Sequence, residues 1–256
     1  MTAVAPRVAV LAGLLCEARR RNCRLPLPGG DWSGFTHEEA LAVQQRVAEH
    51  FGWFGGGHPP AWKLGGSPHA GAVAAPVPAQ AVFAAPWACP AGFAVAHGIE
   101  AELAVRLGRD VPAGAGAAEV LQAIDAFFPC IELCDTRILA SGPLPAALPL
   151  ADQQSNRALV LGPPLAPARL PERGALMVRV ACGGRIVHAG RGGHPFGDPL
   201  ASLPWLATHA ARTHDGLHAG DIIATGTCSG IHWAGAGEDV EVMFGGLGRV
   251  ALRTPA

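Results

Sequence analysis

Apolar residues near the start of the chain recur with the period of a helix. Five of them would share one face: Val8, Leu11, Leu14, Leu15 and Ala18. This spacing predicts an amphipathic helix over residues 5–21. A second helix is predicted to open at Thr36, because Thr36 and Glu39 have the spacing of a capping box. It should end near residue 49, before a run of glycines.

Beyond residue 60 the pattern changes to short apolar runs separated by glycine and proline, which is typical of strands and turns. The predicted strands are residues 61–65, 98–107, 130–138, 157–161, 176–181, 185–190, 221–225, 240–244 and 248–252. Two helices should interrupt them, one over 117–126 and one running from an Asp198 N-cap to residue 213. We therefore predict an N-terminal helical arm (residues 1–59) and one β-rich domain (residues 60–256).

Composition and charge narrow the classes of function. The 34 glycines and 23 prolines favour strands and turns, and a net charge of −1 without a basic stripe predicts no nucleic-acid partner. No apolar run reaches the roughly 20 residues that a membrane span requires, so no membrane partner is expected. The seven cysteines are odd in number and lack paired metal-ligand spacing, which predicts unbridged thiols in a cytoplasmic protein and no zinc site.

Three glutamates carry the most informative pattern. Glu100 and Glu102 fall on the same face of one predicted strand, and Glu132 lies between two cysteines on another. Buried together, such carboxylates need a cation or a proton. An all-oxygen set suits Mg²⁺, which keeps waters that a bidentate substrate can displace. The alternative from spacing alone is an exposed sheet face with solvated carboxylates.

Lys63 lies in an otherwise apolar segment that runs into glycines. A buried ammonium should pair with a carboxylate of the protein or of a substrate. The alternative is a lysine whose stem packs while its head reaches water. Asp135 and Arg137, on the opposite strand face from Glu132, are expected to form a structural ion pair.

Short motifs follow one another along nearly the whole chain. They are Ala-Arg-Arg-Arg (18–21), Leu-Pro-Leu-Pro (25–28), Thr-His-Glu-Glu-Ala-Leu-Ala-Val-Gln (36–44), Trp-Lys-Leu-Gly (62–65), Ile-Glu-Ala-Glu-Leu-Ala (99–104), Ile-Glu-Leu-Cys-Asp-Thr-Arg-Ile (131–138), Ala-Asp-Gln-Gln-Ser (151–155), Gly-Asp-Pro-Leu (197–200), Ala-Gly-Asp-Ile-Ile-Ala-Thr-Gly-Thr (219–227) and Phe-Gly-Gly-Leu-Gly (244–248). In order and spacing, the chain resembles the fumarylacetoacetate hydrolase superfamily, in its 2-keto-4-pentenoate hydratase and 4-oxalocrotonate decarboxylase branch.

The resemblance implies an α+β fold: a mixed β-roll of the fumarylacetoacetate hydrolase C-terminal type with the N-terminal helical arm. It places Mg²⁺ (or Mn²⁺) on Glu100, Glu102 and Glu132, and Lys63 in the pocket. Ser155 and Thr225 match positions near that pocket and are candidate donors to substrate oxygens. Homo-oligomers are common in the family, so a homo-oligomer is expected.

The implied substrate is a small 2-oxo or 2-hydroxydienoic acid, and the implied reaction is hydration of a 2-hydroxy-2,4-dienoate to a 4-hydroxy-2-oxo acid. The alternatives are decarboxylation of a 2-oxo dicarboxylate, acylpyruvate-type C–C hydrolysis, and a catalytically silent paralogue. The hydrolase has least support, because the chain has no convincing His-x-x-Glu motif early on.

Two departures from the branch affect this assignment. The branch's Pro-Asp-x-Gly segment after the lysine is replaced by residues 75–83, which contain no carboxylate, and the glycines after Ser155 are replaced by Asn156 and Arg157. His97 or His69 are candidate substitutes for the missing base. Arg157 is a candidate for binding a second substrate carboxylate.

Overall fold

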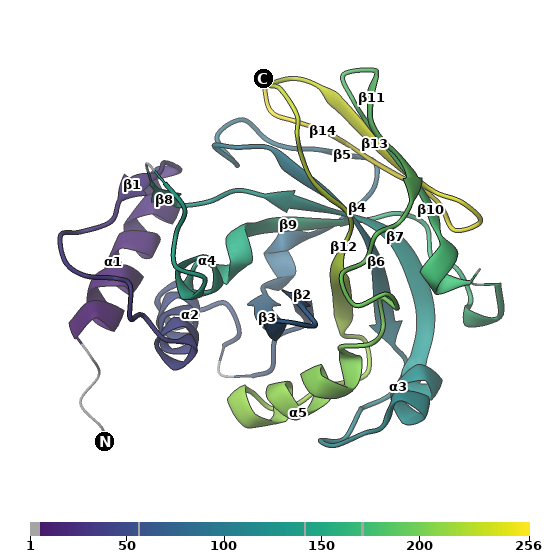
Figure 1. Ribbon diagram of the computed structural model, residues 1–256, viewed down its shortest axis with the longest axis horizontal. Helices are drawn as coiled ribbons and strands as arrows, with labels where there is room; N and C mark the ends of the chain where they lie inside the picture. The colour runs from purple at the N-terminus through teal and green to yellow at the C-terminus, as the bar shows by residue number, and fades with distance from the viewer. Residues whose placement is uncertain (1–5, 56, 141, 170–171) are drawn as a thin grey trace.

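A computed structural model describes residues 6–55, 57–140, 142–169 and 172–256. Its helices gather mainly at one end and along the lower edge of two sheets (Figure 1). The helices are α1 (Pro6–Arg21), α2 (His37–Phe51), α3 (Ala117–Ala123), α4 (Ala147–Ala151) and α5 (Leu203–Thr213). No helix in these ranges is long and apolar enough to cross a bilayer.

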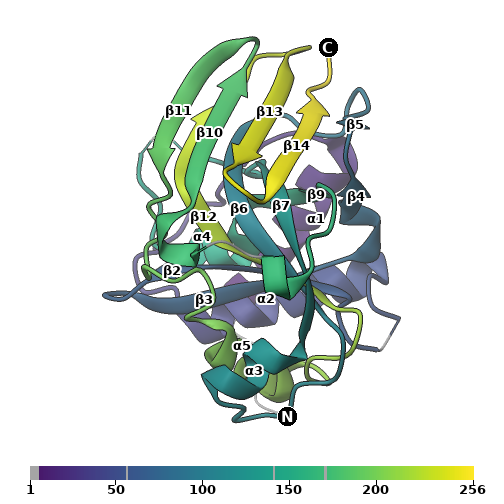
Figure 2. The same cartoon turned by 90° about the vertical axis from the view of Figure 1, so that its right-hand side faces the viewer.

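The larger sheet has seven strands and mixes parallel with antiparallel pairs. In spatial order they are β3 (Gly71–Val77), β2 (Ala61–Ser67), β12 (Ile222–Trp233), β6 (Gly98–Leu107), β7 (Ile124–Cys134), β9 (Asn156–Leu161) and β4 (Val82–Ala84). A five-stranded sheet lies over part of it (Figure 2): β11 (Arg185–Arg191), β10 (Met177–Cys182), β13 (Asp239–Phe244), β14 (Gly248–Arg253) and β5 (Trp87–Ala88). Short strands β1 (Leu25–Pro26) and β8 (Ile138–Leu139) pair separately.

The main core lies between these two sheets. Ile99 and Leu103 on β6 and Ile131 on β7 are completely buried, and they belong to the same apolar cluster as Val180 and Phe244 of the smaller sheet. Burying each such side chain contributes roughly 1.5–3 kcal/mol. This packing holds β6 and β7 rigidly, and the other face of the same two strands presents the acidic residues.

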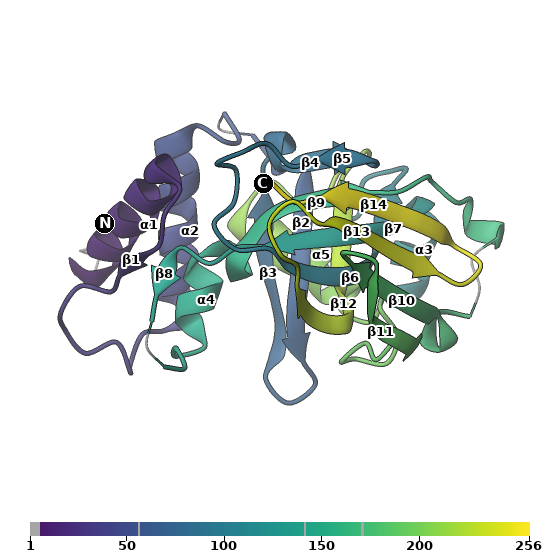
Figure 3. The same ribbon diagram turned by 90° about the horizontal axis from the view of Figure 1, so that it is seen from above.

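The helical arm has its own apolar cluster. Leu11, Leu15 and Val43 pack with Leu148 of α4, and Figure 3 shows α1, α2 and α4 together at one end of the molecule. The predicted capping box at Thr36 is present, so the start of α2 is confirmed. Since Leu148 belongs to the second half of the chain, the arm is held by residues on both sides of residue 60. The division at residue 59 stays a prediction.

Several predicted boundaries were wrong. The helix predicted over 117–126 ends at Ala123, because Ile124 already begins β7, whose residues are almost all buried. The strand predicted over 130–138 is the second half of β7, which stops at Cys134. Periodicity failed here because a strand covered on both faces loses its polar alternation.

The last helix begins later than predicted. It starts at Leu203, so Asp198 is not its N-cap. The carboxylate of Asp198 instead accepts from the backbone N–H of Leu200 and pairs with Arg173. This later start places Pro204 in the first turn, where its missing N–H has no intrahelical partner to lose.

Candidate active site

Four adjacent strands of the large sheet bring the predicted metal ligands and Lys63 together. Lys63 lies on β2, Glu100 and Glu102 on β6, and Glu132 on β7, directly opposite Glu100 in the antiparallel register. Strand β12, which carries Thr225, runs between β2 and β6. Since side chains alternate along a strand, Glu100 and Glu102 share the face on which Glu132 also lies.

These groups are buried and paired. The Nζ of Lys63 lies 3.0 Å from Oε2 of Glu132 and 3.8 Å from Oε2 of Glu100. Glu102 and Glu132 are completely buried, and Lys63 nearly so. The structure therefore shows an ammonium paired with protein carboxylates, and it places only Glu100 in partial contact with solvent.

Burial and mutual repulsion determine how these groups titrate. Burial, together with the carboxylate of Glu132, raises the pKa of Glu100 to about 7 and raises that of Glu102 well above its usual range. For Lys63, burial lowers the pKa but the carboxylates of Glu132 and Glu100 outweigh it, so the pKa is raised. Lys63 is therefore a cation near neutral pH, and the carboxylates need further positive charge to ionise together.

The carboxylate oxygens fit a divalent cation. Oε1 of Glu102 is buried without a hydrogen-bond partner among the described residues, and Oε2 of Glu132 has the ammonium of Lys63 beside it. If all three carboxylates were ionised, the single ammonium would leave two negative charges in excess. Unpaired buried charge is costly, and a divalent cation would balance it.

Cys134 also lies at this cluster. Its Sγ and the carboxylates of Glu100 and Glu132 lie within 4.8 Å of one another. Burial, followed by the charge of Glu132, raises the pKa of the Cys134 thiol well above its usual range. A hard cation prefers carboxylate oxygens to a thiol, which leaves the carboxylates as the donors that suit it.

Two further groups hold the glutamates in place. The side-chain amide of Asn156 donates to Oε1 of Glu132 at 2.8 Å, and the backbone N–H of Gly226 donates to Oε2 of Glu102 at 3.0 Å. Sequence reasoning missed the role of Asn156, because only the fold brings the start of β9 beside Glu132. Such partners orient metal-binding carboxylates.

A cavity of about 160 Å³ opens beside Lys63 and Glu100. Gln154, His194 and Phe196 also line it, and sequence reasoning identified none of them. A Cβ on Gly65 would lie 2.3 Å from the side-chain oxygen of Gln154, so a larger residue here would push that side chain out of its present position. The motif Trp-Lys-Leu-Gly thus supplies both the lysine and the space beside it.

His194 supports the cavity wall. Its Nδ1 accepts from the backbone N–H of Phe196, so the proton is on Nε2, which donates to the carbonyl of Thr225 at 3.0 Å. Burial lowers the pKa of His194, which keeps the ring neutral. Both ring nitrogens are therefore used in positioning the loop after β11.

Ser155 and Thr225, the candidate donors, are in different settings, and Ser155 is not among the described residues that line the cavity. Thr225 lines the cavity, but its hydroxyl donates to the carbonyl of Leu103 at 2.7 Å. Ser155 ends a turn in which Gln153, Gln154 and Ser155 all have left-handed φ angles of 48°, 53° and 63°. Such conformations cost of order 1 kcal/mol each for non-glycine residues and cluster at functional sites. The roles of both hydroxyls stay predictions.

The other candidate residues are placed differently. His69 is exposed in the β2–β3 turn, and neither it nor His97 is among the described residues that line the cavity.

The prediction of an ion pair between the side chains of Asp135 and Arg137 was wrong. Arg137 pairs with Asp152 through a 2.6 Å contact, while Asp135 accepts backbone N–H groups of residues 95 and 96.

Comparison with known proteins identifies the family. Residues 57–254 match the model of the fumarylacetoacetate (FAA) hydrolase C-terminal family. The chain belongs to the fumarylacetoacetate hydrolase family. The predicted resemblance is thereby confirmed, and the three glutamates and Lys63 all lie within the matched range.

Relatives of this fumarylacetoacetate hydrolase family member include two groups of enzymes. It is 32% identical over 164 residues to 2-keto-4-pentenoate hydratase 1 of Dechloromonas aromatica (strain RCB), which covers 63% of this chain and 61% of the relative. It is 29% identical over 156 residues to 4-oxalocrotonate decarboxylase of Pseudomonas putida, covering 60% and 59%. The match thus spans less than two thirds of either relative's length.

The fold of this fumarylacetoacetate hydrolase family member is found in a solved structure as well. The 4-oxalocrotonate decarboxylase from Pseudomonas putida G7, complexed with magnesium and adipate, superposes with a TM-score of 0.85 at 22% identity over 97% of both chains. The expected α+β fold with its β-roll and helical arm is confirmed by this likeness.

Proposed function

We propose that this protein is a divalent-metal-dependent hydratase that adds water to a 2-hydroxy-2,4-dienoate of the 2-keto-4-pentenoate type, giving a 4-hydroxy-2-oxo acid. The observation that carries the proposal is the buried cluster of Glu100, Glu102 and Glu132 around Lys63 beside a cavity. The similarity to 2-keto-4-pentenoate hydratases supports the choice of reaction.

The three glutamates are the proposed ligands of Mg²⁺ or Mn²⁺, because they offer only oxygen donors. When bound, the cation would supply Lewis acidity toward the carboxylate and adjacent oxygen of a 2-oxo acid. The solved structures of the 4-oxalocrotonate decarboxylase with magnesium and adipate, and with calcium and acetate, support a divalent ion of this kind.

The chain's own residues would bind and orient the substrate. Lys63, cationic and held by Glu132, would neutralise the substrate anion or assist proton transfer. Asn156 and the N–H of Gly226 would keep the glutamates oriented while the substrate enters. Ser155 and Thr225 are proposed as further donors, Thr225 after release of its bond to Leu103.

A decarboxylase of a 2-oxo dicarboxylate is the second candidate. Apart from Glu100, the described residues that line the cavity beside Lys63 include no carboxylate that could act as a base to activate water. Decarboxylation requires the same anchoring of the 2-oxo acid and no activated water, so this feature favours it. An acylpyruvate-type C–C hydrolase and a catalytically silent paralogue follow as weaker alternatives.

We further propose that the protein is cytoplasmic and forms a homo-oligomer. All seven cysteines, each within the described residues, are free thiols, which agrees with a reducing compartment. The smaller sheet exposes Met177, Ile186 and Met243, large apolar side chains that a second copy could cover.

The test is the ultraviolet absorbance of 2-hydroxypenta-2,4-dienoate mixed with the protein, first with Mg²⁺ and then with EDTA. Metal-dependent loss of the dienol signal, with 4-hydroxy-2-oxopentanoate as the product, is expected. CO₂ release from a 2-oxo dicarboxylate without hydration would favour the decarboxylase instead. Metal binding without turnover of either substrate would favour the silent paralogue.

A further inference from the structure

Gln154 lines the cavity beside Lys63 from the turn of residues 153–155, which joins α4 to β9. Its side-chain nitrogen, Nε2, is buried and has no hydrogen-bond partner among the described residues. An unpaired buried donor is costly, so nearly all such groups meet an acceptor from the protein, from water or from a ligand. Since the described residues offer none, the acceptor for this amide should come from what occupies the cavity.

The turn holds this side chain in place at a cost to its backbone. Gln154 has a left-handed φ angle of 53°, between two residues that are also left-handed. The backbone N–H of Ser155 donates to the carbonyl of Asp152, and the carbonyl of Ser155 accepts from the N–H of Asp135, both at 2.8 Å. Strained backbones of this kind persist where the surrounding structure fixes them, and they cluster at functional sites. The fixed turn therefore presents the amide of Gln154 to the cavity in one place.

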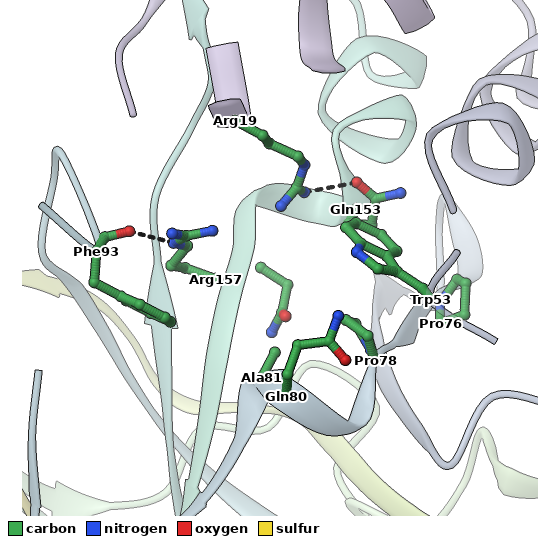
Figure 4. Close-up of a pocket in the computed structure, with 10 residues that line it drawn as sticks. Arg19, Trp53, Pro76, Pro78, Gln80, Ala81, Phe93, Gln153 and Arg157 are labelled. Carbon is green, nitrogen blue, oxygen red and sulfur yellow. Dashed lines mark hydrogen bonds between the residues drawn. The ribbon is translucent and has the colours of Figure 1, made fainter. Parts of the chain in front are cut away.

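The preceding residue faces a different part of the molecule. Gln153 lines a second cavity, of about 90 Å³, together with Arg19 of α1 and Arg157 of β9. Figure 4 shows the side chain of Gln153 accepting a hydrogen bond from Arg19, at 2.8 Å. Among the described residues that line the cavity beside Lys63, Gln154 is thus the only glutamine.

The amide of Gln154 has room to present its nitrogen to a ligand. It lies against Gly65, where a Cβ would be 2.3 Å from the amide oxygen. A half-turn about the last torsion of the side chain exchanges its oxygen and nitrogen within the same space, because the two ends of an amide have nearly the same shape. The nitrogen can therefore donate toward either side of that space.

The other side-chain donors that line this cavity are engaged within the protein. The hydroxyls of Thr225 and Thr227 donate to backbone carbonyls. His194 uses both of its ring nitrogens. Apart from the ammonium of Lys63, the amide of Gln154 is therefore the one uncommitted side-chain donor among the described residues that line the cavity.

We propose that Gln154 is a substrate-binding residue whose side-chain amide donates a hydrogen bond to a carboxylate oxygen of the 2-oxo acid. The proposal rests on the proposed function, in which one carboxylate oxygen and the adjacent oxygen of the substrate face the cation. The second carboxylate oxygen remains in the cavity as a strong acceptor, and a hydrogen bond to an ionised group is stronger than one between neutral groups. Gln154 thereby fixes the direction in which the rest of the substrate chain points.

The experiment measures binding of 2-oxopentanoate, a 2-oxo acid without the double bond that hydration requires, by isothermal titration of the full chain in Mg²⁺. The variants are Gln154→Gly, Gln154→Glu and, as a control for the second of these, Gln122→Glu on the exposed surface of α3. Glycine adopts a left-handed backbone without strain, so Gln154→Gly should fold.

Gln154→Gly should bind 2-oxopentanoate about tenfold to a hundredfold more weakly than the parent, since a hydrogen bond to a charged group is lost. Its affinity for Mg²⁺, measured without the 2-oxo acid, should not change. Gln154→Glu should bind 2-oxopentanoate more weakly still, because its carboxylate repels that of the ligand. Gln122→Glu should bind it as the parent does.

Two results would overturn the proposal. One is equal affinity for 2-oxopentanoate in the parent and in Gln154→Gly, with circular dichroism showing that the variant is folded, which would leave water as the partner of the amide. The other is equal or tighter binding by Gln154→Glu, which would mean that the ligand donates to residue 154 instead of accepting from it.

The hydration assay of the parent separates this proposal from the proposed function. Hydration of 2-hydroxypenta-2,4-dienoate, together with unchanged 2-oxopentanoate binding in Gln154→Gly, would remove the role of Gln154 and keep the hydratase. No hydration, together with 2-oxopentanoate binding that depends on Mg²⁺ and on Gln154, would remove the hydratase and keep Gln154 as a residue that binds 2-oxo acids. A parent that binds no 2-oxopentanoate in Mg²⁺ would contradict the role of Gln154 whether or not it hydrates the dienoate.

Discussion

Lys63 and Glu132 form an ion pair of 3.0 Å although both side chains are almost completely removed from solvent. Removing one partner of such a buried pair destabilises the folded protein, because the remaining charge has no solvent to compensate it. The pair also sets the charge of the whole cluster, since Glu100 lies within 4 Å of the same ammonium.

Replacing Lys63 with Met should therefore destabilise the metal-free protein and strengthen its response to metal. We expect the free energy of unfolding in EDTA to fall by about 3 kcal/mol, as for other broken buried pairs. Urea titrations in EDTA and in Mg²⁺ measure both effects. An unchanged free energy of unfolding in EDTA would mean that Lys63 does not hold the carboxylates together.

Glu102→Gln should abolish stabilisation by Mg²⁺, because it removes one ionised ligand from the cluster. The matched control is Glu119→Gln, on the exposed surface of α3 and outside the cluster. Melting temperatures with and without Mg²⁺ give the comparison. If both variants respond to Mg²⁺ as the parent does, the three-glutamate site is wrong.

Asn156→Ala should leave Oε1 of Glu132 buried without its donor. Leaving a buried acceptor unsatisfied costs about 1–3 kcal/mol, so the free energy of unfolding should fall by that amount. Mg²⁺ affinity, measured by calorimetry, should fall about tenfold or more, as for other residues that orient metal ligands. A variant as stable as the parent and with the same Mg²⁺ affinity would contradict this role.

The stability of the protein should depend on pH through His209, on α5. Burial, and then the nearby His214 and Arg212, lower the pKa of His209 to about 4. Between pH 4 and about 6.5 the unfolded chain therefore binds a proton that the folded protein does not, so this residue makes stability rise with pH across that window and then level off.

His209→Gln should flatten this rise, measured as urea unfolding at several pH values between 4.5 and 7.5. The quantity compared is the slope of the free energy of unfolding against pH, so a uniform loss of stability in the variant does not affect it. Equal slopes for parent and variant would show that His209 is accessible to protons when folded.

The glutamates could be found from the sequence because their placement follows from local periodicity. Glu100 and Glu102 are two residues apart on one strand, and the position of Glu132 between two buried cysteines marked it as enclosed. Lys63 could be found because it interrupts an apolar segment.

Asn156, Gln154 and His194 could not be found in this way. Asn156 reaches Glu132 through the pairing of β7 with β9, and His194 reaches Thr225 from a loop far along the chain. Contacts made by the register of distant strands leave no periodic pattern near either residue. Arg157 was a candidate from the sequence, but the cavity that it shares with Arg19 exists only because the fold brings α1 and β9 together.

The turn of Gln153, Gln154 and Ser155 has a consequence for any attempt to evolve this protein. Each residue holds a left-handed backbone that glycine would adopt without strain. A selection for heat resistance alone should therefore accept glycine here readily, gaining backbone relaxation at each step. It would also delete the side-chain amides of Gln153 and Gln154, which face the two cavities, so heat resistance and ligand binding should oppose each other at these two positions.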